Sequence, residues 1–400
     1  MVSYLFFALI FLSFVFGQFA RLPLSNGVYL TLIDVTVVTF SLFFTVSYLI
    51  QKKGKFVKSP LFVPWLLFCV AAVISLLANS LVLRTSEIAV ASLYLLRFCA
   101  YTLPLFFLPF FSKNQKLWLV RVLIVSVLVT VGVGFVQFVY YPNLRNLFYL
   151  GWDDHLYRLF SVFLDPNFAS VLFSCLFIVL VGLTVEFIRI GRMKAVGLAG
   201  LSVLTALAVF LTYSRTGMIA LVIGTIVLFF LKGYKRLLLV CLGVFVLFLA
   251  FTADLKVEGL NPFRTASSVA RIESIKIAFG IFEKNPIFGV GFNAYRYAQH
   301  RYGFRLDGVW ETSHADAGTD NSFLFVLATT GIVGFSAYLY FWYVLLSRTY
   351  ATIKQEKSGL PVIVFATLIA VLVSSLFLNT LFYPFILIWI VSLFGVMERK

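Results

Sequence analysis

Arginine residues next to or within apolar runs are the side chains of this sequence best suited to bind an anion. Arg215 stands in Tyr213-Ser214-Arg215-Thr216-Gly217, a polar interval of only a few residues between two apolar runs. A guanidinium in this place either extends its charge to the membrane interface or binds a phosphate through two parallel hydrogen bonds. The residues alone favour neither interpretation over the other.

Arg97 lies inside an apolar run, where a charge is costly. It is eleven residues into the run 86–111, and a charged side chain at the centre of a membrane helix costs roughly 2.5–3.5 kcal/mol on insertion scales. Such a residue needs a partner or a water-filled cavity. Glu87 is ten residues away, nearly three helical turns, so it is not expected to be the partner. We therefore expect Arg97 to face a cavity.

Asp320 and His314 are the candidates for proton transfer. Asp320 comes directly before the apolar run that starts at Asn321, so it is either a helix N-cap or a carboxylate that accepts the proton of an attacking hydroxyl. His314 is the only histidine near it, and a single loop histidine is most often just solvated. The sequence shows no spacing typical of a Ser-His-Asp triad, a zinc site or a phosphate-binding loop.

The elements that carry these residues are expected to be transmembrane helices. The 400 residues are 62% hydrophobic and 12% charged, whereas an ordinary soluble domain has roughly 45–50% apolar and 25% charged residues. Apolar runs of about twenty residues recur, long enough for helices to cross the bilayer. They are apolar on every side, which excludes a β-barrel. We predict an all-α integral membrane protein, with its four cysteines as small core residues.

About twelve spans are expected in a single polytopic domain covering residues 1–400, with boundaries good to a few residues. The expected spans are 3–20, 28–50, 61–79, 86–111, 117–140, 166–188, 195–213, 216–231, 237–253, 322–346, 360–379 and 383–397. The first lacks the basic start and the cleavage site of a signal peptide, so we expect it to be a span.

The charges between the spans predict the orientation of the chain. Every second connection is basic, as the positive-inside rule requires of cytoplasmic loops. The formal charge of +16 is therefore mostly a topology signal, and we expect no nucleic-acid partner. Both termini, Lys55 and Lys357 are predicted to be cytoplasmic, and 141–165 and 254–321 to be outside.

The large loop, 254–321, is predicted to contain an amphipathic helix. Apolar residues recur there every three or four positions, which is the spacing of one helix face, and Ser267 or Ser268 would cap the helix. The stripe comprises Val269, Ile272, Ile275, Phe279 and Phe282. Arg271 is about 200° from the start of the stripe, so it points elsewhere while the apolar face lies on the membrane. Gly289-Val290-Gly291 is expected to be a flexible turn, and 305–320 a mobile segment.

Three pieces of the chain resemble the O-antigen ligase and Wzy-type polysaccharide polymerase superfamily. The residues around Arg215 resemble the family's Ser-Arg-x-Gly motif. Arg271 and the later run from Pro286 to Gly291 are similar to its loop arginine and the Pro-x-x-Gly-x-Gly that follows. The family's His-Asn pair and subsequent Gly-x-x-Gly are matched by Asn321, Gly331 and Gly334.

A fourth piece, from Arg158 to Asp165-Pro166-Asn167, resembles the family's segment before a mid-chain helix. The resemblance implies a GT-C-like glycosyltransferase of the bacterial cytoplasmic membrane that uses no metal and no other cofactor. Such enzymes transfer a glycan from undecaprenyl pyrophosphate to a glycan or lipid acceptor on the outer face. Arg215 and Arg271 would hold the pyrophosphate, and we extend this expectation to Arg97 and Arg158.

The chain departs from the family at one position, because Asp320 stands where the family's ligase pattern has histidine. Either Asp320 takes the role of that histidine, or His314 reaches in from the adjacent segment. The change weakens a ligase assignment more than a polymerase assignment, so we slightly favour a polymerase. The alternative is a transporter of sugars or lipid-linked oligosaccharides, but we find no repeat of the 254–321 loop in the other half of the chain, as the paired repeats of transporters would require.

Overall fold

The computed structural model is built almost entirely of helices. It describes residues 2–24, 28–52, 59–150, 154–188, 190–239, 243, 265–304, 317–356 and 359–398. Within these ranges, eight helical segments are long and apolar enough to cross a membrane, and three shorter apolar helices accompany them. The prediction of an all-α integral membrane protein is confirmed.

The long helices are α1 (Val2–Phe16), α2 (Leu32–Lys52), α4 (Thr85–Thr102), α6 (Lys113–Tyr140), α7 (Pro166–Phe187), α8 (Arg192–Leu211), α9 (Arg215–Lys232) and α13 (Ser322–Gln355). The shorter apolar helices are α3 (Phe62–Ala78), α14 (Leu360–Ser374) and α15 (Pro384–Met397). Eleven of the twelve expected spans coincide with these helices. The expected span 237–253 lies almost wholly outside the described residues.

Two details differ from the expectation. The second span starts later than predicted, because a hairpin of β1 (Arg21–Pro23) and β2 (Tyr29–Thr31) precedes it, with Leu22 opposite Leu30. The expected helix 86–111 is divided at Pro104, which has no backbone N–H to continue the hydrogen-bond ladder. The short helix α5 (Pro104–Phe107) and one 3₁₀ turn (Leu108–Phe110) follow the break.

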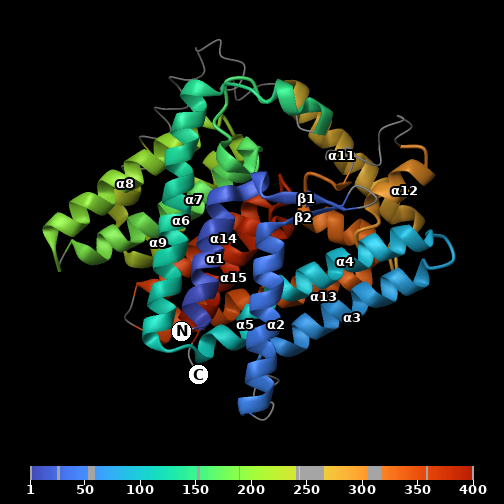
Figure 1. Cartoon of the computed structure of the whole chain (residues 1–400), viewed down its shortest axis with the longest axis horizontal. Helices are drawn as coiled ribbons and strands as arrows, with labels where there is room; N and C mark the ends of the chain where they lie inside the picture. The colour runs from blue at the N-terminus through green and yellow to red at the C-terminus, as the bar shows by residue number, and fades with distance from the viewer. Residues whose placement is uncertain are drawn as a thin grey trace.

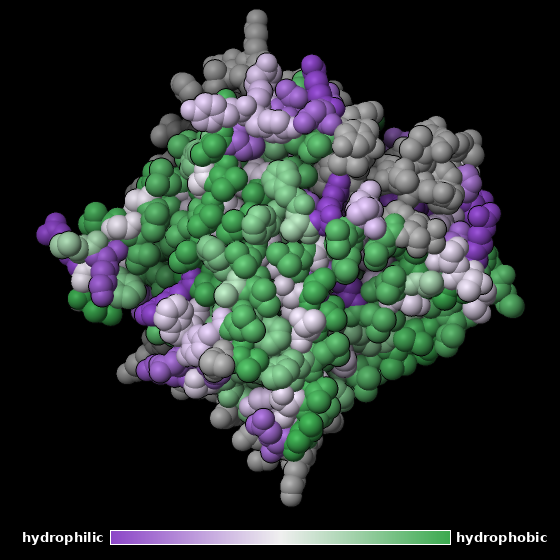
Figure 2. Space-filling model, in the orientation of Figure 1, coloured by the Kyte–Doolittle hydropathy of each residue, from purple (hydrophilic) through white to green (hydrophobic). Residues whose placement is uncertain are grey.

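Helices α14 and α15 occupy the middle of the bundle (Figure 1). All 14 residues of α15 are buried, which fits a helix that is apolar on every side. Helices α7 and α9 pack closely beside α14, and Gly224 of α9 lets the side chain of Ile178 approach its backbone. Small residues are the usual means of such contacts between membrane helices. Apolar residues cover most of the visible surface, and polar residues gather mainly at its edges (Figure 2).

Both chain termini lie at the same end of the bundle (Figure 1). The Lys116 ammonium, near the start of α6, donates a hydrogen bond to the main-chain oxygen of Glu398 at 2.8 Å. Helix α6 then runs for 28 residues, or about 42 Å, to the other end. We call that other end the distal end. Helices α8 and α9 meet there, and α11 (Thr265–Lys284) and α12 (Tyr295–Arg301) lie beside it.

Candidate functional site

The turn between α8 and α9 sets the position of Arg215. Tyr213 has a left-handed backbone conformation with φ of 51°. The buried hydroxyl of Ser214 caps α9 by accepting a hydrogen bond from the N–H of Gly217 at 3.4 Å. Arg215 is therefore the first residue of α9, and its side chain starts where a helix presents free N–H groups. A helix N-terminus favours bound anions, and a guanidinium adds to that preference.

Gly217 presses the start of α9 against α7. A Cβ on this glycine would lie 2.2 Å from the hydroxyl oxygen of Ser170. The neighbouring Ser174 hydroxyl donates a hydrogen bond to the main-chain oxygen of Gly217 at 2.9 Å. The glycine of the Ser-Arg-x-Gly motif is thus required by close helix packing, which fixes the turn that bears Arg215.

Arg271 reaches this turn from α11. Its Nη2 donates a hydrogen bond to the hydroxyl of Thr216 at 3.2 Å, and Thr216 directly follows Arg215. The two arginines, 56 positions apart in the chain, therefore belong to one region of the distal end. That both arginines bind one pyrophosphate, as the family resemblance implies, stays a prediction.

Arg158 contacts the other side of the same turn. Its Nε donates to the main-chain oxygen of Thr212 at 2.8 Å, and its Nη2 donates to the Oδ1 of Asn167 at 3.2 Å. Asn167 lies in the first turn of α7, which Asp165 caps by accepting the Asn167 N–H at 2.7 Å. The Asp165-Pro166-Asn167 segment thus helps to orient Arg158 toward residues 212–216, so three of the four predicted arginines contact or belong to this turn.

Arg97 is directed to a different partner. Its Nε lies 2.6 Å from Oδ1 of Asp34, and its Nη2 donates to Oδ2 at 3.0 Å. Asp34 is buried in the first turn of α2 and also accepts the Tyr101 hydroxyl at 2.9 Å. The cavity that we expected around Arg97 is replaced by this ion pair. One feature of the sequence could have identified this partner: Asp34 is the one charged residue in the run 28–50. The sequence alone, however, does not show that the spans of Asp34 and Arg97 are neighbours.

Asn321, not Asp320, is the N-cap of α13. The Oδ1 of Asn321 accepts the N–H groups of Phe323 at 2.9 Å and Leu324 at 3.0 Å. Its Nδ2 donates to the main-chain oxygen of Leu376 at 3.0 Å, which ties the cap to the end of α14. The capping role that the sequence offered to Asp320 is therefore wrong. Asp320 is exposed, one residue before the cap.

Helix α11 brings Asp320 into the same region as Arg271. Ser274, three residues after Arg271 and so on the same helix face, shares a hydrogen bond of 2.8 Å with the hydroxyl of Thr319. The Ser274 hydroxyl also accepts the N–H of Asp320 at 3.3 Å. Four of the five residues of the predicted apolar stripe of α11, namely Val269, Ile272, Ile275 and Phe279, are exposed.

The segment 286–291, which contains Gly289 and Gly291, packs against the segment 328–333, which contains Gly331. We call this contact the joint. Helix α13 is interrupted at Gly331, where φ is 63° and ψ is −168°. The loop 286–291 fills the interruption and makes main-chain hydrogen bonds to both halves of the helix. The pairs are Val290 N–H to Ala328 O at 3.2 Å, Gly291 N–H to Thr329 O at 3.0 Å, Ile332 N–H to Pro286 O at 2.8 Å and Val333 N–H to Ile287 O at 3.3 Å.

This joint, residues 286–291 with 328–333, corrects the expectation of a flexible turn at Gly289. A Cβ on Gly289 would lie 2.4 Å from the main-chain carbon of Thr329, and one on Gly331 would lie 2.2 Å from the main-chain oxygen of Ile287. Gly334 is also tightly packed, against Thr330. Two backbones meet here without room for side chains, so both glycines are structural requirements.

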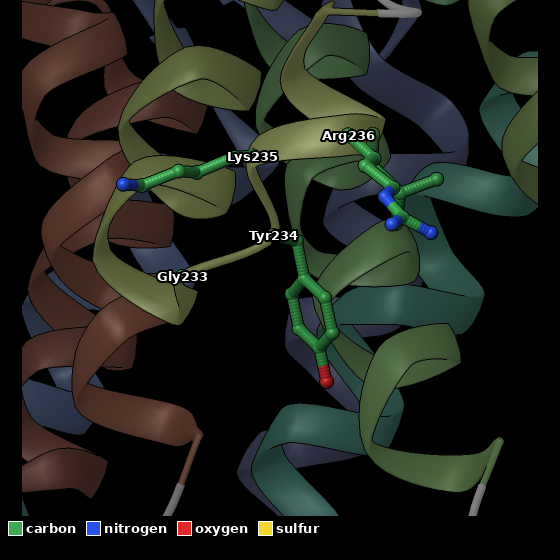
Figure 3. A pocket seen from close by; sticks show the side chains of 5 residues that line it. Gly233, Tyr234, Lys235 and Arg236 are labelled. Atoms are coloured by element: carbon green, nitrogen blue, oxygen red, sulfur yellow. The ribbon is translucent and has the colours of Figure 1, made fainter.

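Three further features do not belong to the arginine region: His314, a metal site and a surface hollow. His314 falls outside the described residues, and among the described ones no group of three His, Cys, Asp or Glu side chains could hold a metal ion. An open hollow lined by Gly233, Tyr234, Lys235, Arg236 and Leu237 follows α9 (Figure 3). It lies at the opposite end of α9 from Arg215, about 27 Å away, so it is not part of the arginine region.

The fold and the distal arginines define a multi-pass, all-α membrane protein with a site suited to an anionic ligand. A comparison with family models matches residues 200–339 to the O-antigen ligase family. The matched region contains Arg215, Arg271, Asp320 and the joint. The resemblance to the O-antigen ligase and Wzy-type superfamily is confirmed, and the chain carries this family's region. No curated protein matches the chain. The match over residues 200–339 supports a glycan transferase of the kind found in that family.

Proposed function

We propose that this protein transfers a glycan from undecaprenyl pyrophosphate, or a similar polyprenyl pyrophosphate, to the hydroxyl of an acceptor. We place the reaction at the distal end, on the outer face of a bacterial cytoplasmic membrane. The observation that carries the proposal is the hydrogen bond from Arg271 to Thr216, because Thr216 directly follows Arg215 in the first turn of α9. The family assignment supports the same chemistry.

The donor's pyrophosphate is the group that the arginines would bind. When the bond between the sugar's anomeric carbon and the pyrophosphate oxygen breaks, negative charge grows on the leaving group. Forked guanidinium groups stabilise this charge by paired hydrogen bonds, and the N-terminus of α9 adds its dipole. Arg215 and Arg271 would make these contacts, and Arg158 would support the turn through Thr212.

The acceptor's proton is assigned to Asp320. The acceptor oxygen attacks the anomeric carbon, the pyrophosphate leaves, and the carboxylate of Asp320 takes the hydroxyl proton. Two observations support this assignment: Asn321 does the capping of α13, and Ser274 links the Asp320 backbone to the helix that bears Arg271. His314 is the competing base.

Between the two enzyme classes, we slightly favour a polymerase, whose acceptor is another lipid-linked repeat, over a ligase. Mass spectrometry of lipid-linked glycans from cells with and without the gene tests this choice. Loss of a polymerase leaves single repeats on the lipid, whereas loss of a ligase leaves long chains that are not attached to an acceptor. Unchanged glycans of both kinds would refute the proposed function.

Within the described part of the chain, the break in α13 favours the transporter alternative, because transporters often bind substrates at broken helices. In this protein, however, the loop 286–291 bonds to the main-chain groups on both sides of the break. Those groups are therefore engaged by protein and are not offered to a substrate. If the protein is a transporter, its loss should leave lipid-linked glycan on the inner leaflet. The same mass spectrometry, combined with leaflet-specific labelling, detects this.

A further inference from the structure

Ser75 of α3 and Asn79, the C-cap residue of α3, hold the joint from outside. The hydroxyl of Ser75 donates a hydrogen bond to the main-chain oxygen of Thr329 at 2.7 Å. One turn further along α3, the Nδ2 of Asn79 donates to the main-chain oxygen of Gly289 at 2.9 Å. Both side chains are buried, with 0% and 7% of their surface exposed. Thr329 belongs to α13 and Gly289 to the inserted loop, so α3 binds both sides of the joint.

These contacts satisfy a physical requirement of the break. Within a bilayer each unpaired main-chain group costs several kcal/mol, so irregular backbone persists only where protein groups satisfy it. A carbonyl oxygen has two lone pairs, and Thr329 uses both, one for the N–H of Gly291 and one for Ser75. The carbonyl of Gly289 is served by Asn79. Without these donors, buried oxygens of the joint lose hydrogen bonds.

The joint in turn determines where α11 lies. Helix α11 ends at Lys284, and the inserted loop begins two residues later at Pro286. The C-terminal end of α11 is thus fixed in the break of α13, while Ser274 is fixed to Thr319, just before α13 begins. Arg271 lies about 20 Å along the helix from the joint, so a small change of angle at the joint moves its guanidinium appreciably relative to Thr216.

We propose that Ser75 and Asn79 are positioning residues for the distal site: by holding the joint, they set the place of Arg271 relative to Arg215 and Asp320. The catalytic part of this inference rests on the proposed function. The positioning part does not, because it concerns the order of the joint itself.

Hydrogen–deuterium exchange of the full-length protein in nanodiscs tests the positioning part directly. The amides of Val290 and Gly291 are bonded across the joint, and we expect them to exchange at least about tenfold faster in Asn79→Leu and in Ser75→Ala. Ser126→Ala is the matched control, since that serine is equally buried but bonds only to Val122 O of its own helix. Unchanged exchange at 286–292 in both α3 variants would overturn the inference.

Kinetics test the link to Arg271. Asn79→Leu should lower kcat/KM for glycan transfer roughly tenfold, and the same change made in an Arg271→Lys background should cost much less, because the group being positioned is already altered. Ser75→Thr, which keeps the hydroxyl, should retain more activity than Ser75→Ala. Fully additive losses would refute a positioning role. If the wild-type protein transfers no glycan, the proposed function fails, and the exchange rates still decide whether α3 holds the joint.

Discussion

Arg271 and Thr216 are joined by a hydrogen bond of 3.2 Å although they are 55 positions apart in the chain. One partner belongs to a helix beside the bundle and the other to the first turn of a transmembrane helix. The contact fixes the end of the long Arg271 side chain to a residue in the first turn of α9. Whether this hydrogen bond is formed therefore indicates whether α11 and the start of α9 are correctly positioned relative to each other.

Lysine should be a poor substitute for Arg215 and for Arg271. A point ammonium cannot reproduce the two parallel hydrogen bonds of a guanidinium, so we expect Arg215→Lys and Arg271→Lys each to lower glycan transfer at least about tenfold. Arg145→Lys is the control, because Arg145 forms an exposed ion pair with Asp154 and such pairs contribute little. Transfer assays in membranes normalised for protein level check this. Full activity of both test variants would rule out a paired clamp.

Asp320→Asn should abolish most transfer without destabilising the protein. If Asp320 is the base, the loss is roughly 10²-fold or more, while the cap made by Asn321 remains intact. Asn321→Ala should instead lower the unfolding free energy by about 1 kcal/mol. Transfer rates and thermal melts of the two variants separate the roles. Normal transfer by Asp320→Asn, with a large loss in His314→Ala, would move the base to His314.

Asp34→Asn should destabilise the protein far more than an exposed pair would predict. It leaves the largely buried Arg97 without its counter-charge, and breaking a buried pair costs about 3 kcal/mol or more. The double change Asp34→Leu with Arg97→Leu should recover much of that stability, because no unpaired charge remains. Thermal unfolding in detergent measures both. Asp154→Asn, which breaks the exposed pair with Arg145, should shift the melt by much less; an equal shift would contradict the prediction.

Gly331→Ala should disrupt the joint, whereas Gly132→Ala should be tolerated. The backbone of Gly331 occupies a region that is essentially restricted to glycine, which costs about 1–3 kcal/mol for another residue, and a new Cβ would clash with Ile287. A Cβ on Gly132 of α6 meets nothing within 4 Å and improves helix propensity. Yield and melting temperature of the purified variants provide the comparison. Equal behaviour of the two would mean that the joint can relax.

The orientation is testable by labelling single cysteines with a membrane-impermeant reagent in intact cells. We expect Arg301→Cys to be labelled and Lys357→Cys to be protected, because alternate connections are basic and so should be cytoplasmic. The opposite result would invert the protein in the membrane and remove the proposed site from the outer face.

Sequence patterns predicted the spans well, because the cost of placing residues in hydrocarbon is a local property of each run. A motif resemblance pointed to Arg215 and Arg271, and their role stays a prediction. Sequence patterns did not predict which spans pack together. Arg97 and Asp34 meet only because α4 and α2 pack in a particular rotation. The cap was missed by one residue because Asp320 and Asn321 both cap well, and the tertiary contact of Asn321 with Leu376 decides between them.

The joint could not be foreseen for a related physical reason. A glycine in a sequence indicates conformational freedom, but it does not show which other backbone approaches it. Gly289 and Gly331 are 42 positions apart, and each is explained only by the presence of the other segment. The two glycines do not mark a flexible turn, because both lie in a contact held by main-chain hydrogen bonds.

The complete burial of α15 has a consequence for how the protein is made. The described helices that enclose α15 precede it in the chain, so during synthesis they are made before their central neighbour. They must keep that space open, or occupied by lipid, until residues 384–397 arrive. Helix α15 has 14 residues and spans only about 21 Å, short of the roughly 30 Å hydrocarbon core. Its insertion thus depends on helices that are already in place.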